Sequence, residues 1–205
     1  MVLKENSLVI VLVGDWNKLY IQPEWITQHV FNKNEVEMEI SGRGSDFTIS
    51  YKSNNVLIPA TQSKMLFSAT KIDKDTLQYL CLCLNNFVRQ AQSAQKISYG
   101  YNVDFSDDNG SLLAKVFDSV SDNFNIVRAG YEIDSMRISQ VLKRDKRKIS
   151  IDSGLINNKA AIHFNEHHDG EDAGPSFCIE DINSFFCECK KILRAQGYEI
   201  EDDES

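Results

Sequence analysis

The chain has 205 residues, of which 42% are hydrophobic and 25% charged, and this composition favours a folded protein over a disordered one. Its net charge of −8 disfavours broad binding to DNA or RNA, because an acidic surface repels phosphate groups. The chain opens without a secretory signal, its first apolar run is far shorter than the roughly 20 residues of a membrane-spanning helix, and its five cysteines are an odd number. These features predict a cytoplasmic protein with reduced thiols and no membrane association.

The first half of the sequence predicts a strand, a short helix, a meander of strands and a long helix. Residues 8–13 form a β-branched run typical of a central strand, and Pro23 fits the first turn of a short helix. Residues 35–40 alternate glutamate with an apolar residue, so one face of this strand must meet water. Returning strands are predicted at 47–51, 56–58 and 65–67, and a helix at 75–91 has a regular apolar stripe.

The second half predicts a similar order of elements. A polar stretch at 92–95 marks the boundary, and residues 97–105 then alternate strictly as a strand. A helix is expected at 112–120, with strands at 124–127, 131–142, 149–151 and 160–164. The segment 167–175 is predicted to be a loop, and 179–196 to be the final helix, with Gly197 ending it.

Both long helices carry an aspartate followed by a Cys-x-Cys pair at a constant offset of 106 residues. The matching residues are Asp75, Cys81 and Cys83 in the first half and Asp181, Cys187 and Cys189 in the second. We therefore predict an α+β fold with a pseudo-duplicated strand-helix-meander-helix repeat. The repeats span 1–92 and 93–198, form one body with a mainly antiparallel sheet backed by two long helices, and precede an acidic tail at 199–205.

This order of elements resembles the two-fold repeated saddle of the TATA-box-binding-protein fold. The resemblance covers most of the chain in element order and involves no sequence motif. It implies that two halves share one curved antiparallel sheet with the long helices on one face. It does not carry over DNA binding, because that family uses a basic sheet face, whereas the strand at 35–40 bears Glu35, Glu37 and Glu39.

A cluster of basic residues interrupts the acidic sequence between two predicted strands. It consists of Lys143, Arg144, Lys146, Arg147 and Lys148. This position predicts the tip of a hairpin. The cluster is interpreted either as a solvated turn that discourages edge-to-edge strand pairing, or as a contact for an acidic partner or a phosphate group.

Histidines and carboxylates gather in the predicted loop before the last helix. The candidate metal ligands are His163, His167, His168 and Asp169, with Glu171 and Asp172 close by in the sequence. These side chains suit zinc, iron or manganese, but their spacing matches no known metal motif. The alternative interpretation is a polar loop exposed to solvent, and the sequence predicts no bound cofactor.

The cysteines and the aromatic residues near the start of the chain have simpler interpretations. Two cysteines at i and i+2 of a helix point about 200° apart, so neither Cys-x-Cys pair chelates a metal, and each cysteine is expected to lie in the core. Nothing in the local sequence marks Cys178 as a nucleophile. Trp16 and Tyr20 are predicted to be exposed at a partner interface, and Trp25 to lie in the core.

The sequence contains no phosphate-binding loop, dinucleotide motif or nucleophile elbow. It favours a non-catalytic binding protein that docks a protein partner as an inhibitor, an immunity-type protein or a complex subunit, with a homodimer through an exposed sheet edge as a further option. Two alternatives remain open at this point. One is a metal-dependent hydrolase using the His163–Asp172 region, and the other is a binder of nucleic acid or nucleotides using Lys143–Lys148.

Overall fold

The computed structural model describes residues 1–14, 16, 22–43, 46–59, 64–91, 97–124, 135–145, 147–156, 159–170 and 175–201. The strands are β1 (Val2–Leu3), β2 (Val9–Val13), β3 (Glu37–Arg43), β4 (Asp46–Ser53), β5 (Val56–Pro59), β6 (Lys64–Ala69), β7 (Ser98–Asp107), β8 (Ser135–Arg144), β9 (Arg147–Ile156) and β10 (Lys159–His168). The helices are α1 (Pro23–Trp25), a π-helical turn η2 (Ile26–Val30), α2 (Lys74–Gln90), α3 (Ser111–Phe124) and α4 (Ile179–Ala195).

All ten strands of the described residues belong to one antiparallel sheet, so the fold is mixed α and β. The order is β3-β4-β5-β6-β2-β7-β10-β9-β8, with the short β1 also paired to β7. The pairing of β2 with β7 joins the first and second halves of the chain in one continuous sheet. Within the described residues, no helix is both long enough and apolar enough to cross a membrane.

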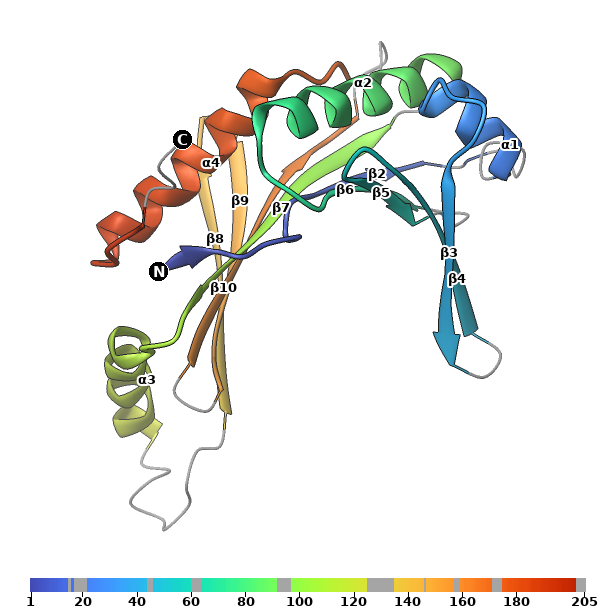
Figure 1. Cartoon of the computed structure of the whole chain (residues 1–205). Coiled ribbons are helices and arrows are strands. Elements are labelled where there is room, and N and C mark those ends of the chain that lie inside the picture. The colour runs from blue at the N-terminus through green and yellow to red at the C-terminus, as the bar shows by residue number, and fades with distance from the viewer. Residues whose placement is uncertain are drawn as a thin grey trace.

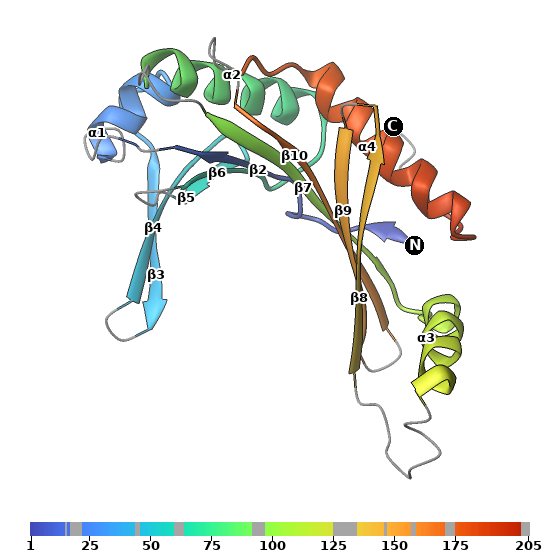
Figure 2. The same cartoon turned by 180° about the vertical axis from the view of Figure 1, so that it is seen from behind.

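The sheet is strongly arched, and α2 and α4 lie end to end over its convex face (Figure 1). The hairpin β3–β4 projects from one end of the arch, and the ends of β8, β9 and β10 project with α3 from the other (Figure 2). Both projecting parts point away from α2 and α4. The concave face between them is not covered by either of these helices.

One row of directly paired residues crosses the whole sheet on its helix-covered face, and we call it the central row. The residues of this row are partners in successive strand pairs. Continuing the β5–β6 pairing by one residue places Ile58 opposite Phe67. In order, its members are Met38, Tyr51, Ile58, Phe67, Ile10, Tyr101, Glu166, Ile149 and Leu142. All inner members are buried and only the two end members, Met38 and Leu142, are exposed. Glu166 is the single charged residue in this row.

Helix α2 begins where the sequence supplies a cap. The Asp73 carboxylate accepts a hydrogen bond from the backbone N–H of Thr76 at 2.8 Å, which satisfies one of the unpaired donors of the first turn. A hydrogen bond from Lys71, and then that from Thr76, lower the pKa of Asp73 to about 2. The apolar stripe of α2 then packs on the sheet, where Phe87 contacts Phe67 at 5.7 Å between ring centroids.

Most predicted elements are found close to their predicted positions, with two differences. The predicted loop at 167–175 begins later, because β10 continues to His168 and pairs with β7 up to Tyr99. Phe124 ends α3 rather than beginning a strand, and the remaining residues of the strand predicted at 124–127 lie outside the described residues.

Candidate functional site

The basic cluster lies, as predicted, at the tip of a hairpin, formed by β8 and β9. Lys143 pairs with Lys148 and Arg144 with Arg147 across this hairpin. Asp145 opens the turn with a φ of 54°, a left-handed conformation that aspartate tolerates better than most residues. Lys146 lies outside the described residues.

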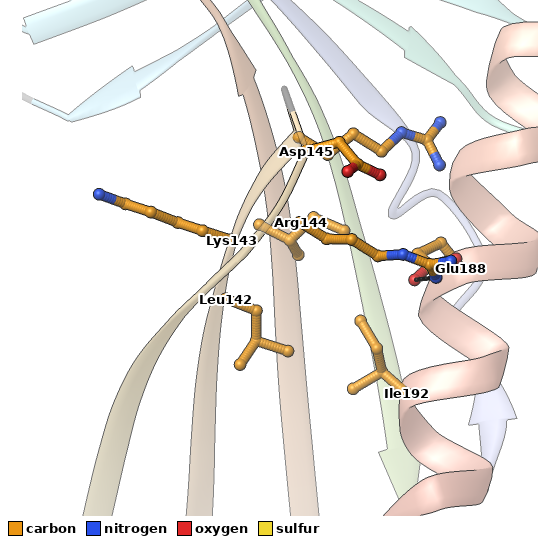
Figure 3. Close-up of a pocket in the computed structure, with 8 residues that line it drawn as sticks. Leu142, Lys143, Arg144, Asp145, Glu188 and Ile192 are labelled. Carbon is orange, nitrogen blue, oxygen red and sulfur yellow. Dashed lines mark ion pairs between the residues drawn. The ribbon is translucent and has the colours of Figure 1, made fainter.

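A pocket of about 750 Å³ separates this hairpin from α4 (Figure 3). Its apolar wall consists of Leu142, Ile149 and Ile192, and the side chains of Leu142 and Ile192 face each other across it. Arg144 reaches toward α4 and lies 3.6 Å from Glu188, whereas Lys143 points away from α4. The pocket therefore combines an apolar interior with a charged rim, on which three basic residues stand beside Asp145 and Glu188.

Arg147 also lines the pocket, but its guanidinium is held by the fold. Its Nε lies 3.1 Å from Oε1 of Glu166, and its terminal nitrogen donates a hydrogen bond to Oγ of Ser184 on α4 at 2.9 Å. Glu166 is only 1% exposed, so this carboxylate depends on nearby cations for its charge compensation. Arg147 therefore has a structural role, whereas Lys143 has no such contact among the described residues.

His168 is the second basic side chain beside Glu166. Its Nε2 lies 3.1 Å from the same Oε1, and neither this contact nor that of Arg147 has the geometry of a hydrogen bond, so the charge of Arg147 is what compensates the carboxylate. The His168 ring stacks on Tyr99 at 4.5 Å between centroids. His168 was expected in a solvated loop, but strand alternation places it on the helix-covered face.

The other candidate metal ligands lie on the opposite side of the sheet. Nδ1 of His163 lies 2.7 Å from Asp104, and Nε2 of His167 lies 3.2 Å from Asp169. Because successive side chains of a strand alternate, His167 and His168 point away from each other. No group of three or more His, Cys, Asp or Glu side chains in the described ranges could hold a metal ion, and Glu171 and Asp172 lie outside those ranges.

Trp16, expected to be an exposed interface residue, is instead in the core. It is 3% exposed, and its ring meets the edge of Phe87 at 5.1 Å between centroids. Trp25 packs partly buried against the same core, as predicted, also contacting Phe87. Tyr20 lies outside the described residues. Trp16 therefore stabilises the packing of α2 and is not available to a partner.

The cysteines are mostly core residues, as expected, with two exceptions. Cys81, Cys83 and Cys189 are buried, and desolvation raises the pKa of both Cys81 and Cys83 to about 12. Cys187, predicted to lie in the core, is exposed, and so is Cys178. The Cys178 thiol donates a hydrogen bond to Asp181 at 3.0 Å, and this carboxylate raises its pKa, which disfavours the nucleophilic thiolate.

This arrangement predicts which thiols react in the folded protein. A maleimide added to the native chain should label Cys178 and Cys187 and leave the three buried cysteines unmodified, whereas all five should react in denaturant. Intact mass spectrometry counts the labels, and peptide mapping locates them. Rapid native labelling of Cys83 or Cys189 would contradict the packing of α2 or α4.

No protein-family model matches the chain, and no curated protein sequence matches it either. The candidate site therefore stands on its own geometry. Sequence reasoning found the basic hairpin but missed Glu166, Glu188 and Ile192. One signal for Glu166 was present, because it continues the alternation of the inward residues Ile162 and Phe164.

Proposed function

We propose that this chain is a non-catalytic binding protein that docks a protein partner, with the pocket between the β8–β9 hairpin and α4 as the point of contact. The pocket itself carries this proposal. On a protein with a net charge of −8, it joins an apolar wall to a rim on which Lys143, Arg144 and Arg147 outnumber Asp145 and Glu188. An apolar pocket with a few charged groups at its edge is typical of the pockets that bury an anchor side chain in a protein interface.

The chemistry of the pocket indicates the kind of segment that it receives. An apolar side chain would fill the space between Leu142 and Ile192, and a neighbouring carboxylate would meet Arg144. A second carboxylate of the partner, on the side of the hairpin away from α4, would meet Lys143. A bare phosphate group fits less well, because Glu188 occupies one side of Arg144 and the wall is apolar. We therefore favour an acidic, partly apolar protein segment over a nucleotide or nucleic acid.

We also infer that the two halves of the chain arose from one duplicated unit. The sheet order reads outward from its centre as β2-β6-β5-β4-β3 on one side and β7-β10-β9-β8 on the other. On each side, the strand beside the central one leads into a 17-residue helix, α2 or α4. Cys83 and Cys189 are both buried, in agreement with their common offset, although Cys81 and Cys187 differ. In an experimental structure, a single rotation should superpose β2 on β7 and α2 on α4 together, and failure to do so would argue against duplication.

The first step of the test is native mass spectrometry of the chain purified from its own cells at low ionic strength, which would identify the partner. Titration calorimetry then measures the affinity of the chain for that partner. Lys143→Glu is expected to weaken binding roughly tenfold, because it reverses a rim charge that has no structural contact in the described residues. Lys115→Glu makes the same change in net charge on α3, away from the pocket, and should have little effect.

Equal affinities for Lys143→Glu, Lys115→Glu and the unaltered chain would contradict a role for the pocket. A nucleic acid recovered in place of a protein, with binding that falls steeply as salt rises, would support the alternative use of the basic hairpin. A stoichiometric metal together with hydrolytic turnover would instead support the hydrolase alternative.

A further inference from the structure

The sheet has two edges, and each carries a strand with a single neighbour in the described part of the chain. β3 ends the sheet on one side and β8 ends it on the other. Both edges belong to parts that project from opposite ends of the arch (Figure 2). An edge strand presents backbone N–H and C=O groups that another strand can pair with.

The two edges carry opposite charges. Glu37 and Glu39 are exposed on β3, with Glu35 exposed just before it, and only the last residue of β3, Arg43, is basic. The exposed charges of β8 are Arg137, Lys143 and Arg144, of which the two arginines also have carboxylate partners within the chain. Two β3 edges, or two β8 edges, would place like charges opposite each other, which destabilises a strand pair. Pairing β3 with β8 would place opposite charges together, so the charges select the pairing of unlike edges.

Each edge also exposes two apolar residues. Met38 and Ile40 are 52% and 64% exposed on β3, and Val141 and Leu142 are 54% and 43% exposed on β8. Met38 and Leu142 are the two ends of the central row and therefore lie on the same face of the sheet. If the β8 edge of one copy met the β3 edge of another, Leu142 could lie opposite Met38 and the central row would continue into the second copy.

The alternation of side chains then sets the neighbouring pairs. With Met38 opposite Leu142, a parallel strand pair places Glu39 opposite Lys143, and an antiparallel pair places Glu37 opposite Lys143. The antiparallel register also brings Arg43 of β3 opposite Arg137 of β8, and these like charges favour the parallel direction. Either direction therefore buries two exposed apolar side chains together and sets a glutamate against Lys143. No residue of the inner sheet needs to change its place.

We propose that copies of this chain associate head to tail, with the β3 edge of one copy pairing with the β8 edge of the next. Such a contact uses two different surfaces, so it builds a ring if its geometry closes and an open chain if it does not. The inference stands on the edges themselves and not on the partner proposed above. Since Leu142 and Arg144 belong to both the β8 edge and the pocket, a bound partner and a second copy would compete for β8.

The test is a charge exchange followed by sedimentation velocity of the full chain over a wide range of concentrations. The unaltered chain should sediment with a mass that rises above 23.3 kDa as concentration increases, and less so in high salt. The double variants Glu37→Lys/Glu39→Lys and Lys143→Glu/Arg144→Glu should each remain monomeric, because each gives its two edges the same charge. An equimolar mixture of the two variants should associate again, since every edge then finds an opposite one.

A monomer at every concentration of the unaltered chain, or a mixture of variants that stays monomeric, would overturn this proposal. Circular dichroism serves as the control for folding, and both variants should be folded because the substitutions are at exposed positions. The β3 variant leaves the pocket unaltered, so it should lose self-association and keep the affinity for the partner. Self-association of the unaltered chain in the absence of any bound protein partner would instead contradict the proposed function alone.

Discussion

Replacing Arg147 by alanine is expected to lower the free energy of unfolding by about 3 kcal/mol, because it leaves the buried Glu166 carboxylate without its main cation. Losses of this kind reach about 5 kcal/mol, but the Arg147 side chain is 36% exposed, so water can replace part of its effect. His168 remains 3.1 Å from the carboxylate in this variant. Urea unfolding followed by circular dichroism measures the change.

The matched control for this prediction is Arg144→Ala on the same hairpin. Its ion pair with Glu188 is longer, at 3.6 Å, and the Arg144 side chain is mostly exposed, so its loss should cost less than about 1 kcal/mol. A double variant, Arg147→Ala with Glu166→Gln, removes the charge that needs compensation and should recover part of the lost stability. If Arg147→Ala and Arg144→Ala unfold at the same urea concentration, Glu166 does not depend on Arg147.

Asn85→Ala is expected to destabilise the protein by about 3 kcal/mol, because the Asn85 side chain makes two hydrogen bonds to the backbone of a single residue, Phe177. Its amide nitrogen donates to the carbonyl of Phe177 at 2.8 Å, and its carbonyl oxygen accepts from the N–H of Phe177 at 2.9 Å. Phe177 is buried against Tyr99, so both backbone groups would lose their partner away from water. The measurement is again the free energy of unfolding in urea.

This pair of hydrogen bonds joins α2 to the segment that leads into α4, so its loss has a second expected effect. Cys81 on α2 lies near Cys178 at the start of α4, and loosening this junction should let Cys81 react with a maleimide in the folded protein. Leu82→Ala is a suitable control, because Leu82 is exposed on the same helix and should cost less than about 0.5 kcal/mol. Equal stability and equal labelling in the two variants would refute the proposed role of Asn85.

The local sequence predicts where the basic cluster lies better than it predicts the role of each of its residues. Reading Lys143–Lys148 as a hairpin tip needed only a run of charges between two alternating segments. The role of each residue was not predictable in this way, since Arg147 compensates a carboxylate on β10 while Lys143 points into solvent. This difference depends on which face each residue occupies and on what the neighbouring strand places there.

Periodicity in the sequence by itself determined the strand at Ser98–Asp107 and the helices at Lys74–Gln90 and Ile179–Ala195, because each has an apolar face that must be buried. Only the tertiary structure decided that Trp16 is buried, since Phe87, the residue that covers it, comes from a helix far along the chain. It also decided that His167 and His168 are in a strand, because pairing with β7 extends β10 through polar residues that show no apolar alternation. The pocket has the same origin: Leu142 and Ile192 are 50 residues apart in the chain, and only the packing of α4 beside the hairpin brings them face to face.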